Sequence, residues 1–391
     1  MAAGSLVAAD VHAALARAGP TAEAAGDSAI TFAGPRGVDR FTATMHKKFL
    51  LRLLDILPTQ YSSLDTNRLT LLYFCVSGLD VLGALDAVDA DRIIRWIYSL
   101  QVLPPTDAAG EVPPDRCAGF RGSGYLGSPF DAEGSPSSSG YDGGHLAMTY
   151  TALAILTILG DDLSRVHRER TLAFVRSLQD EGSGHFWAYR GGEADMRFLY
   201  CAAAICTFLR DEEWIGIDVE LATQYVARSQ CYDGGIGLGP GQESHGGSTY
   251  TAVGALALMG TIDALPRRAE LVQWCVERQV GGFQGRPNKD EDTCYSFWIG
   301  ASLDLLGAPH LTDANALCDF ACACQHPAYG GIAKLVGNPP DVLHTYFAIC
   351  GMSLAGRPGL RELHTPLGIT VRAARAAGLV SAEDACPPCD P

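Results

Sequence analysis

Basic residues are scarce in this sequence. Lys and Arg number 29 against 44 Asp and Glu in 391 residues, which gives a formal net charge of −15. Binding along a nucleic-acid backbone needs clustered Lys and Arg, so we expect no nucleic-acid partner. The chain also lacks an apolar run of transmembrane length, and its N-terminus lacks a basic segment followed by an apolar core. We therefore expect a cytoplasmic protein without stable membrane insertion.

Cysteine is not scarce, but its distribution does not indicate disulfides. The chain contains 13 Cys, an odd number, and most of them lie within apolar segments. This pattern favours reduced thiols inside a cell. Cys386 and Cys389 form a CxxC near the C-terminus with no second pair nearby, so we interpret them as part of a flexible, Pro-rich end.

What the sequence does contain is a repeat with a period of roughly 50 residues. Five amphipathic segments end on a Gln, and each is followed by a Gly-rich turn and a segment of small apolar residues. Such a period is typical of stacked helix pairs, none of which buries its apolar face alone. The glutamines are Gln101, Gln179, Gln230, Gln279 and Gln325.

Counting the helix pairs predicts an all-α fold, an α6–α6 barrel also called an α/α toroid. Six charged, amphipathic segments are predicted as outer helices: 41–57, 89–101, 161–179, 217–230, 265–279 and 313–325. Six apolar segments are predicted as inner helices, because helices enclosed by others are apolar nearly all round: 68–83, 148–160, 197–209, 248–260, 293–307 and 343–356. The toroid domain is expected over 39–375, between a disordered tail at 1–38 and a flexible tail at 376–391.

Aromatic residues recur near the starts of the inner segments. Any single one is best explained as core packing, but the set could line a central funnel for a long apolar ligand. The residues are Phe74, Tyr150, Phe198, Tyr200, Tyr250, Phe297, Trp298 and Tyr346.

Asp292, Cys294 and His344 form a plausible oxygen, sulfur and nitrogen ligand set for zinc. Three protein ligands leave a fourth position open, as in catalytic sites, and a zinc-bound thiol is held as the nucleophilic thiolate. The repeat places these residues at equivalent inner-helix starts. The alternative is that Asp292 caps a helix, Cys294 is a small buried residue and His344 is a satisfied polar group of the core.

A second polar group suggests an anion site. His245 precedes Gly246 and Gly247 at a helix start, where backbone N–H groups could approach phosphate oxygens. Arg286 and Lys289 supply cations on the next loop. The alternative is a solvated basic loop that balances neighbouring acids. A zinc thiolate, a diphosphate clamp and an aromatic funnel together indicate alkyl transfer from an allylic diphosphate to sulfur.

At these residues the chain resembles the β subunits of the protein prenyltransferases, over roughly residues 45–375. That group comprises farnesyltransferase, type I geranylgeranyltransferase and Rab geranylgeranyltransferase. The loop at 128–140 and the Ala-rich N-terminus look like insertions of one lineage. The segments that look most like type I are YSSLDTNRLT, CAGFRGSGYLG, TILGDDLSRV, DMRFLYCA, QESHGGST, GRPNKDEDTCYSFWIGA and DVLHTYFAICGMSL.

Three positions within the resemblance favour type I. Thr70 stands where farnesyltransferase has a bulky Trp that shortens its lipid pocket, so a twenty-carbon chain is expected to fit. Leu343 stands where farnesyltransferase has Tyr. Lys334 matches the type I lysine that replaces a magnesium-binding Asp, so no Mg²⁺ requirement is expected.

The resemblance also implies residue roles. Asp292, Cys294 and His344 match the zinc ligands, with one Zn²⁺ for each β subunit. The diphosphate-binding set is matched by His245, Gly246, Gly247, Arg286, Pro287, Asn288, Lys289, Tyr295 and Lys334; the isoprenoid-binding set by Thr70, Arg197, Tyr200 and Trp298; and the peptide-binding set by Thr70, Phe74, His145, Ala147, Phe198 and Leu343.

The implied reaction transfers geranylgeranyl from geranylgeranyl diphosphate to the Cys of a C-terminal CaaX motif, with X usually Leu. The implied partners are a prenyltransferase α subunit, in a heterodimer, and CaaX-tailed proteins such as small GTPases. Three alternatives stay open: a farnesyltransferase β subunit, a terpene cyclase-like toroid and a non-catalytic scaffold. The protonating DxDD motif of the cyclases is only half matched by residues 290–293.

Overall fold

The computed structural model describes residues 41–103, 118–124 and 143–380. The predicted tail at 1–38, the loop at 128–140 and the Cys386–Cys389 pair lie outside the described residues. Residues 376–380 of the other predicted tail are described. There α14 (Val371–Ala376) is followed by a turn in which the Leu379 N–H donates to Ala374 O, so the expected boundary at 375 falls inside a helix.

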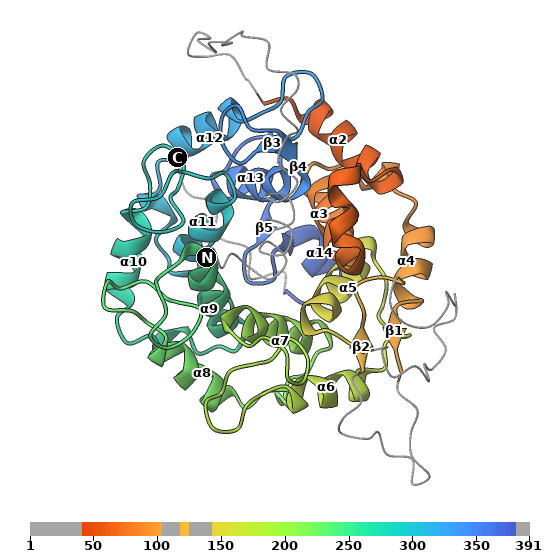
Figure 1. The fold of residues 1–391 in the computed structure, drawn as a ribbon, viewed down its shortest axis with the longest axis vertical. Coiled ribbons are helices and arrows are strands. Elements are labelled where there is room, and N and C mark those ends of the chain that lie inside the picture. Colours follow the sequence, from red (N-terminus) through yellow and green to blue (C-terminus); the bar gives the residue numbers. More distant parts are fainter. Residues whose placement is uncertain (1–40, 104–117, 125–142, 381–391) are drawn as a thin grey trace.

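Six inner helices form a closed ring (Figure 1). Each contacts the next in chain order, and the last contacts the first. Their apolar composition explains their position inside the ring. In the inner helix Leu146–Leu159, for example, every residue except Leu159 is buried. The inner helices are α3 (Arg68–Val81), α5 (Leu146–Leu159), α7 (Met196–Phe208), α9 (Gly246–Leu258), α11 (Tyr295–Leu305) and α13 (Val342–Leu354).

Six outer helices surround this ring, so the predicted α6–α6 barrel is confirmed. Asp89, Asp218 and Asp313 cap three of them, each accepting a hydrogen bond from a backbone N–H of the first turn. These caps start the helices a residue or more later than the sequence predicted. The outer helices are α2 (Ala43–Asp55), α4 (Ala90–Tyr98), α6 (Arg168–Ser177), α8 (Val219–Arg228), α10 (Arg268–Val276) and α12 (Ala314–Ala323).

Short elements join the helix pairs. Four 3₁₀ helices are described, at Thr59–Asn67, Leu85–Ala87, Ile262–Ala264 and Pro309–Leu311. Three antiparallel pairs of two-residue strands are described: β1 (Gln101–Val102) with β2 (Gly119–Phe120), β3 (Ile332–Ala333) with β4 (Pro340–Asp341), and β5 (Leu363–His364) with β6 (Ile369–Thr370). Among the described helices, none is long and apolar enough to span a membrane.

The repeated glutamines link each outer helix to the next. In three repeats the side-chain amide donates to the carbonyl and accepts from the N–H of the residue that caps the following outer helix, at 2.7–3.2 Å. These pairs are Gln179 with Asp218, Gln230 with Arg267 and Gln279 with Asp313. Gln101 bonds likewise to Arg165 O and His167 N. The repeat signal in the sequence is therefore a hydrogen-bonded link between neighbours.

Gln325 closes the ring between the last and first outer helices. Its Oε1 accepts from the N–H of Thr42, the cap of α2, at 2.9 Å, and lies 2.8 Å from His46 Nε2. We expect Gln325→Ala to lower the free energy of unfolding by about 1–3 kcal/mol, because the buried His46 ring loses the acceptor of its Nε2–H. Thermal unfolding measures this. Gln273→Ala, which removes an exposed amide bonded to Glu277, is the control, and equal melting of the two variants would contradict the role of Gln325.

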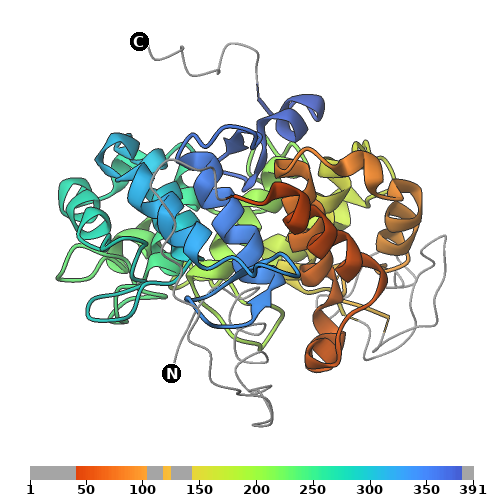
Figure 2. The same cartoon turned by 90° about the horizontal axis from the view of Figure 1, so that it is seen from above.

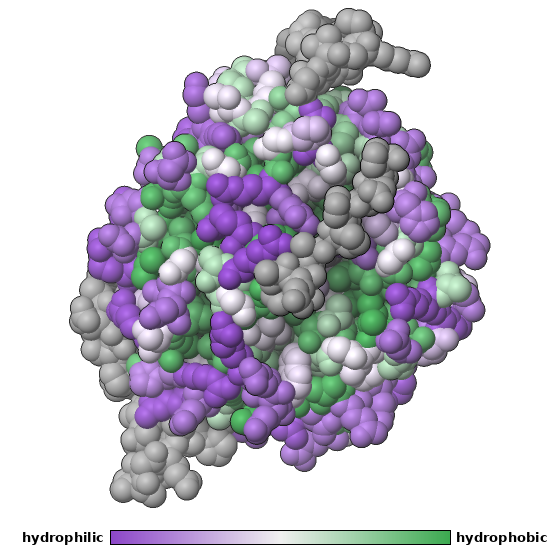
Figure 3. All heavy atoms as spheres, turned by 180° about the vertical axis from the view of Figure 1, so that it is seen from behind, coloured by the Kyte–Doolittle hydropathy of each residue, from purple (hydrophilic) through white to green (hydrophobic). Residues whose placement is uncertain are grey.

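The C-terminal ends of the inner helices are closed by residues 361–376, and Figure 2 shows α14 projecting from that face. Asp80, at the C-terminal end of α3, is fully buried and binds Arg361, Arg372 and the hydroxyl of Thr370. Figure 3 shows this face: hydrophilic side chains gather near its middle and at its edge, with hydrophobic surface between them. The N-terminal ends of the inner helices lie at the other face, where the predicted polar residues are.

Candidate functional site

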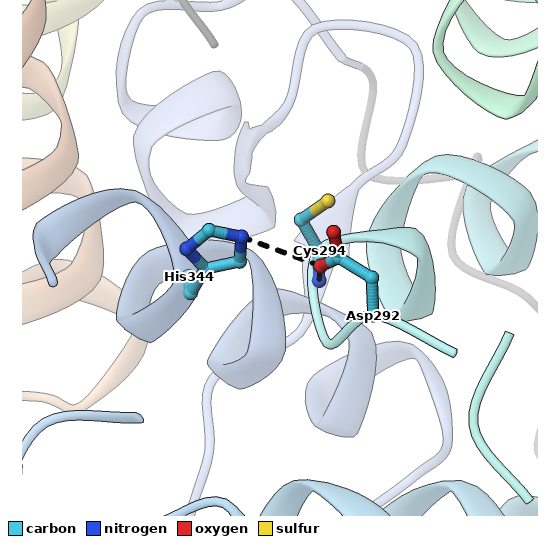
Figure 4. A group of neighbouring side chains, drawn as sticks. All are labelled: Asp292, Cys294 and His344. Atoms are coloured by element: carbon cyan, nitrogen blue, oxygen red, sulfur yellow. Dashed lines mark hydrogen bonds and ion pairs between the residues drawn. The ribbon is translucent and has the colours of Figure 1, made fainter. Parts of the chain in front are cut away.

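Asp292, Cys294 and His344 lie together at the starts of α11 and α13, as the sequence predicted. One potential ligand atom from each lies within 4.8 Å of the other two, and all three residues are buried. Figure 4 shows the imidazole of His344 facing the carboxylate of Asp292, with Nε2 3.3 Å from Oδ1. The fold thus brings Cys294 and His344, which are 50 residues apart in the sequence, together with Asp292 into one compact group of oxygen, sulfur and nitrogen ligand atoms.

The β3–β4 pair fixes the two loops that carry these residues. Thr293, between the first two, donates its N–H to Lys334 O and its hydroxyl to Ala333 O, which anchors that loop to the end of β3. Asp341, in β4, accepts from the N–H of His344 at 2.9 Å and lies 2.6 Å from its Nδ1. A carboxylate on the far nitrogen of a ligating His orients the ring. Sequence reasoning missed Asp341.

The charges at this site suit a cation. Burial alone would raise the pKa of the Asp292 carboxyl, but His344 and Lys334 hold it well below its ordinary value. Burial and the charge of Asp292 raise the pKa of the Cys294 thiol to about 12. A bound metal ion reverses this effect, since a coordinating thiol is deprotonated outright. The donor set, its burial and the support from Asp341 therefore fit a metal ion.

Lys334 lies beside this set. Its Nζ is 3.6 Å from Asp292 Oδ2, and about a third of its side chain is exposed. Its ammonium lies close to the carboxylate of Asp292, and its role in binding diphosphate stays a prediction.

His245 and Tyr295 form a hydrogen-bonded pair at the starts of α9 and α11. His245 caps α9: its Nδ1 accepts from the Gly247 N–H at 3.0 Å, and its Nε2 lies 2.9 Å from Tyr295 Oη. Burial and the nearby Arg286 lower the pKa of His245 to about 4, so the ring is neutral. With Nδ1 accepting, the proton resides on Nε2 and is donated to Tyr295 Oη. The phenol proton is then available to a ligand.

The two glycines do not act as expected. The Gly246 N–H donates to Gly285 O at 2.8 Å, and the Gly247 N–H is used by His245, so both groups are engaged within the protein. Gly285 instead provides space, because a Cβ there would lie 2.0 Å from the Tyr295 ring. A Cβ at Gly246 would lie 3.0 Å from both Tyr295 and Ile299. These positions need glycine so that the loops and α11 can pack closely.

The basic loop at 286–289 lies at the edge of the site. The Arg286 guanidinium pairs with the exposed carboxylate of Glu243. Pro287 is half-buried and Asn288 has a left-handed backbone with φ 61°. Lys289 is exposed, and its carbonyl accepts from Gln284 Nε2 at 2.6 Å. Arg286 is thus held by an acid that an anionic ligand could displace, and sequence reasoning did not identify Glu243.

An aromatic cavity lies inside the ring of inner helices. Seven of the eight aromatics predicted from the sequence line it, and Phe198 is the exception. Tyr73, Phe347 and Gly368 line it as well and were missed. Their signal was weak, since Tyr73 and Phe347 lie beside aromatics already chosen and Gly368 lies outside every predicted helix.

The predicted lipid and peptide residues fall into two groups. Arg197, Tyr200, Trp298 and Phe74 line the cavity. Arg197 is buried there and paired with Asp195 and Glu193, which satisfies its charge. The remaining residues are described outside that lining: Thr70, His145, Ala147, Phe198 and Leu343.

All of this second group except Leu343 lie at or beside the start of α5. The hydroxyl of Thr70 lies 3.8 Å from Met148 Sδ, and the ring of His145 lies 6.0 Å from that of Phe198, edge to face. Burial, with the charge of Arg197, lowers the pKa of His145 to about 4. Ala147 and Leu343 are fully buried. Of the peptide-binding set only Phe74 lines the aromatic cavity, and the peptide pocket stays a prediction.

Comparison with known proteins finds a matching family and two similar curated proteins. The "Prenyltransferase alpha-alpha toroid domain" family matches residues 41–369. A geranylgeranyl transferase type-1 subunit beta from Arabidopsis thaliana is 42% identical over 85% of this chain and 90% of its own length. One from Dictyostelium discoideum is 40% identical over 84% of this chain and 94% of its own.

A solved structure has the same fold. It is Candida albicans protein geranylgeranyltransferase-I complexed with GGPP, which matches with a TM-score of 0.72 and 23% identity. The match covers 87% of this chain and 98% of that chain. At this identity the likeness concerns the fold alone.

Proposed function

The chain belongs to the prenyltransferase α/α toroid family, and from this we propose that it is the catalytic β subunit of a type I protein geranylgeranyltransferase. The observation that carries the proposal is the buried Asp292–Cys294–His344 set at the starts of α11 and α13, beside a cavity lined by aromatics of the inner helices. A possible metal site and a possible lipid site therefore lie next to each other within the ring of inner helices. Both type-1 relatives support the choice of class.

The reaction is a displacement at the first carbon of the lipid. The bond from that carbon to the diphosphate oxygen breaks, a bond to the sulfur of the substrate Cys forms, and diphosphate leaves with the bonding electrons. Asp292, Cys294 and His344 would hold Zn²⁺, one for each β subunit, which supplies a thiolate at neutral pH. Asp341 keeps the His344 ring in position through Nδ1.

The surrounding donors stabilise the charge that builds on the departing diphosphate. The Nε2–H of His245 donates to the Tyr295 hydroxyl oxygen, so the hydroxyl proton of Tyr295 is free to be donated to the diphosphate. Arg286 exchanges Glu243 for a phosphate oxygen. Lys289 and Lys334 would add cations without a second metal, and no Mg²⁺ requirement is therefore expected. Donors that are fixed before the reaction are the effective ones.

The two pockets divide substrate recognition. The aromatic cavity takes the twenty-carbon lipid, with Arg197, Tyr200 and Trp298 in its wall. The pocket of Thr70, His145, Ala147, Phe198 and Leu343 takes the last residue of the CaaX tail. An α subunit completes the enzyme as a heterodimer, and the cytoplasm, where tails of small GTPases are available, is its location.

The cations at 286–289 provide one test. We expect Arg286→Ala and Lys289→Ala each to lower kcat/KM roughly ten- to a hundredfold, since a charge-assisted contact is worth about 1.5–3 kcal/mol. Zinc content should not change, because neither residue contacts the metal set. Arg268→Ala is the control, as this partly exposed residue starts the outer helix α10 and pairs with Asp263 of the 3₁₀ helix before it. Unchanged kcat/KM in both test variants would remove the loop from the site.

Metal analysis separates the proposal from its rivals. One zinc per chain is expected in the purified protein, whereas a terpene cyclase-like toroid or a binding scaffold needs no thiolate and imidazole ligands. A farnesyltransferase β subunit would also contain zinc, so the choice of lipid donor must decide between these two. Zinc-free protein with full transfer activity would contradict the mechanism.

A further inference from the structure

The turns that follow the repeated glutamines must satisfy their backbone N–H groups. In three of these turns a side chain of the same turn does so, within three residues of the glutamine. These acceptors are Asp180, Asp233 and His326, each bonded to one or two N–H groups of its own turn at 2.7–3.3 Å. Each of these turns therefore carries its own acceptor.

The turn after Gln279 differs, because its acceptor comes from another part of the loop. Residues 280–282 are Val-Gly-Gly and offer no side-chain acceptor. The N–H groups of Gly281 and Gly282 donate instead to Oε2 of Glu291, the first of them at 2.9 Å. Glu291 stands directly before Asp292 of the metal set. This turn is thus bonded to the residue beside a candidate metal ligand.

Glu291 also closes the base of the basic loop. Its backbone pairs with Gln284 in an antiparallel bridge, so these two residues enclose the loop 285–290. That loop contains both cations of the predicted diphosphate site at 286–289, and Asp292 follows Glu291 on the other side. One residue therefore joins the basic loop to the metal set.

The 280–282 turn is a firm attachment for the Glu291 carboxylate. Gly282 is buried, and a Cβ there would lie 2.3 Å from the ring of Phe320 on the outer helix α12. Just beyond the turn, the Gln284 N–H donates to Arg278 O at 2.8 Å, next to the end of α10. The outer helices thereby fix the place to which Glu291 is bonded.

Charge pairing does not explain where the Glu291 carboxylate lies. Within the described part of the chain its hydrogen bonds are those from the two backbone N–H groups of the turn. Arg286, a cation of the neighbouring loop, pairs with Glu243 instead. Successive backbone N–H groups form a binding site for an anion, so the turn, and not a cation of the loop, holds Glu291.

We propose that Glu291 is a positioning residue for prenyl transfer, which fixes the basic loop and Asp292 relative to each other. This inference rests on the proposed function. The loop binds the diphosphate and the metal binds the thiol, so their separation determines whether sulfur can reach the first carbon of the lipid. Glu291 acts through these neighbours, because its own carboxylate is bonded to the turn.

The test compares Glu291→Ala with the wild type in the full-length chain, co-purified with its partner subunit. Zinc affinity is measured by competition with a chelator, and transfer by a single-turnover assay at saturating zinc. Both should fall roughly tenfold, the lower end of the loss caused by removing a partner outside a ligand shell. If neither changes, Glu291 only caps its turn and the proposal is overturned. Wild-type protein that binds no zinc would instead refute the proposed function.

Asp180→Ala is the matched control. It removes the acceptor of an equivalent turn, but the bonds of Asp180 stay within that turn. The control should lower the melting temperature about as much as Glu291→Ala does, because similar N–H groups lose their acceptor. Its zinc affinity and transfer rate should equal those of the wild type. Equal losses of both in the two variants would show a general effect of weakened turns and would contradict the role of Glu291.

Glu291→Gln separates positioning from charge, and serves if Glu291→Ala does not fold. The amide keeps an oxygen that can accept from Gly281 and Gly282 but removes the negative charge. Charge alone predicts tighter binding of geranylgeranyl diphosphate once an acid beside its cations is removed. Positioning predicts weaker binding in Glu291→Ala and a smaller loss, in binding and in transfer, in Glu291→Gln. Tighter diphosphate binding by the Gln variant would overturn the proposal.

Discussion

Replacing Cys294 by Ala is expected to abolish zinc binding and to lower prenyl transfer by more than about a hundredfold. Loss of a partner outside the ligand shell already costs roughly 10–100-fold, and Cys294 supplies the only sulfur of the buried O, S, N set. His344→Ala should behave in the same way. Zinc is measured by elemental analysis of the purified complex, and transfer by a single-turnover assay.

Cys275→Ala is the matched control for these variants. Cys275 is also buried, but it lies on the outer helix α10. Its loss should lower the melting temperature slightly, through a small cavity, and leave zinc content and transfer unchanged. A Cys294→Ala protein with a full complement of zinc and normal turnover would show that this set is not the metal site.

Thr70→Trp is expected to reverse the lipid preference from twenty carbons to fifteen. Thr70 is fully buried on α3, one turn before Phe74, which lines the cavity. Since the site is already packed against Met148, an indole must take volume from the neighbouring cavity. The fourth isoprene unit contributes about 4 kcal/mol at roughly 0.8 per methylene, so excluding it should weaken the longer donor by about a thousandfold.

The control is Thr70→Val, which keeps the volume and removes the hydroxyl. Its lipid preference should equal that of the wild type. Thr70→Trp is expected to cost about 1–3 kcal/mol of stability through overpacking, so its melting curve and zinc content must be measured alongside. A folded Thr70→Trp protein that still prefers the twenty-carbon donor would show that this position does not measure lipid length.

The helical repeat could be predicted from sequence because its signals are local. Gln179, Gln230 and Gln279 recur at a fixed place in each unit, and the structure shows that each bonds to the next unit in the same way. Inner helices were identified because burial on all sides requires apolar residues nearly all round. Seven of the eight aromatics predicted near their starts line the central cavity.

Other details of the site could not be predicted. Asp341, three residues before His344, looks like an ordinary helix cap, and the sequence does not indicate that its second oxygen contacts the His344 ring. The expected use of the Gly246 N–H failed because Gly285 O, from the next repeat, takes it. The turn between β5 and β6 has no repeat signal and no long helix, although a side chain from each of the six inner helices bonds to it.

The account's central claim is best tested by a competition between lipid donors. The full-length chain, co-expressed with a prenyltransferase α subunit, is given equal amounts of farnesyl and geranylgeranyl diphosphate, a peptide ending in a CaaX motif with Leu last, and zinc without Mg²⁺. Mass spectrometry of the peptide identifies the product. We expect the Cys to carry a geranylgeranyl group in nearly all of the product. A farnesylated product, or transfer only after Mg²⁺ is added, would contradict the assignment.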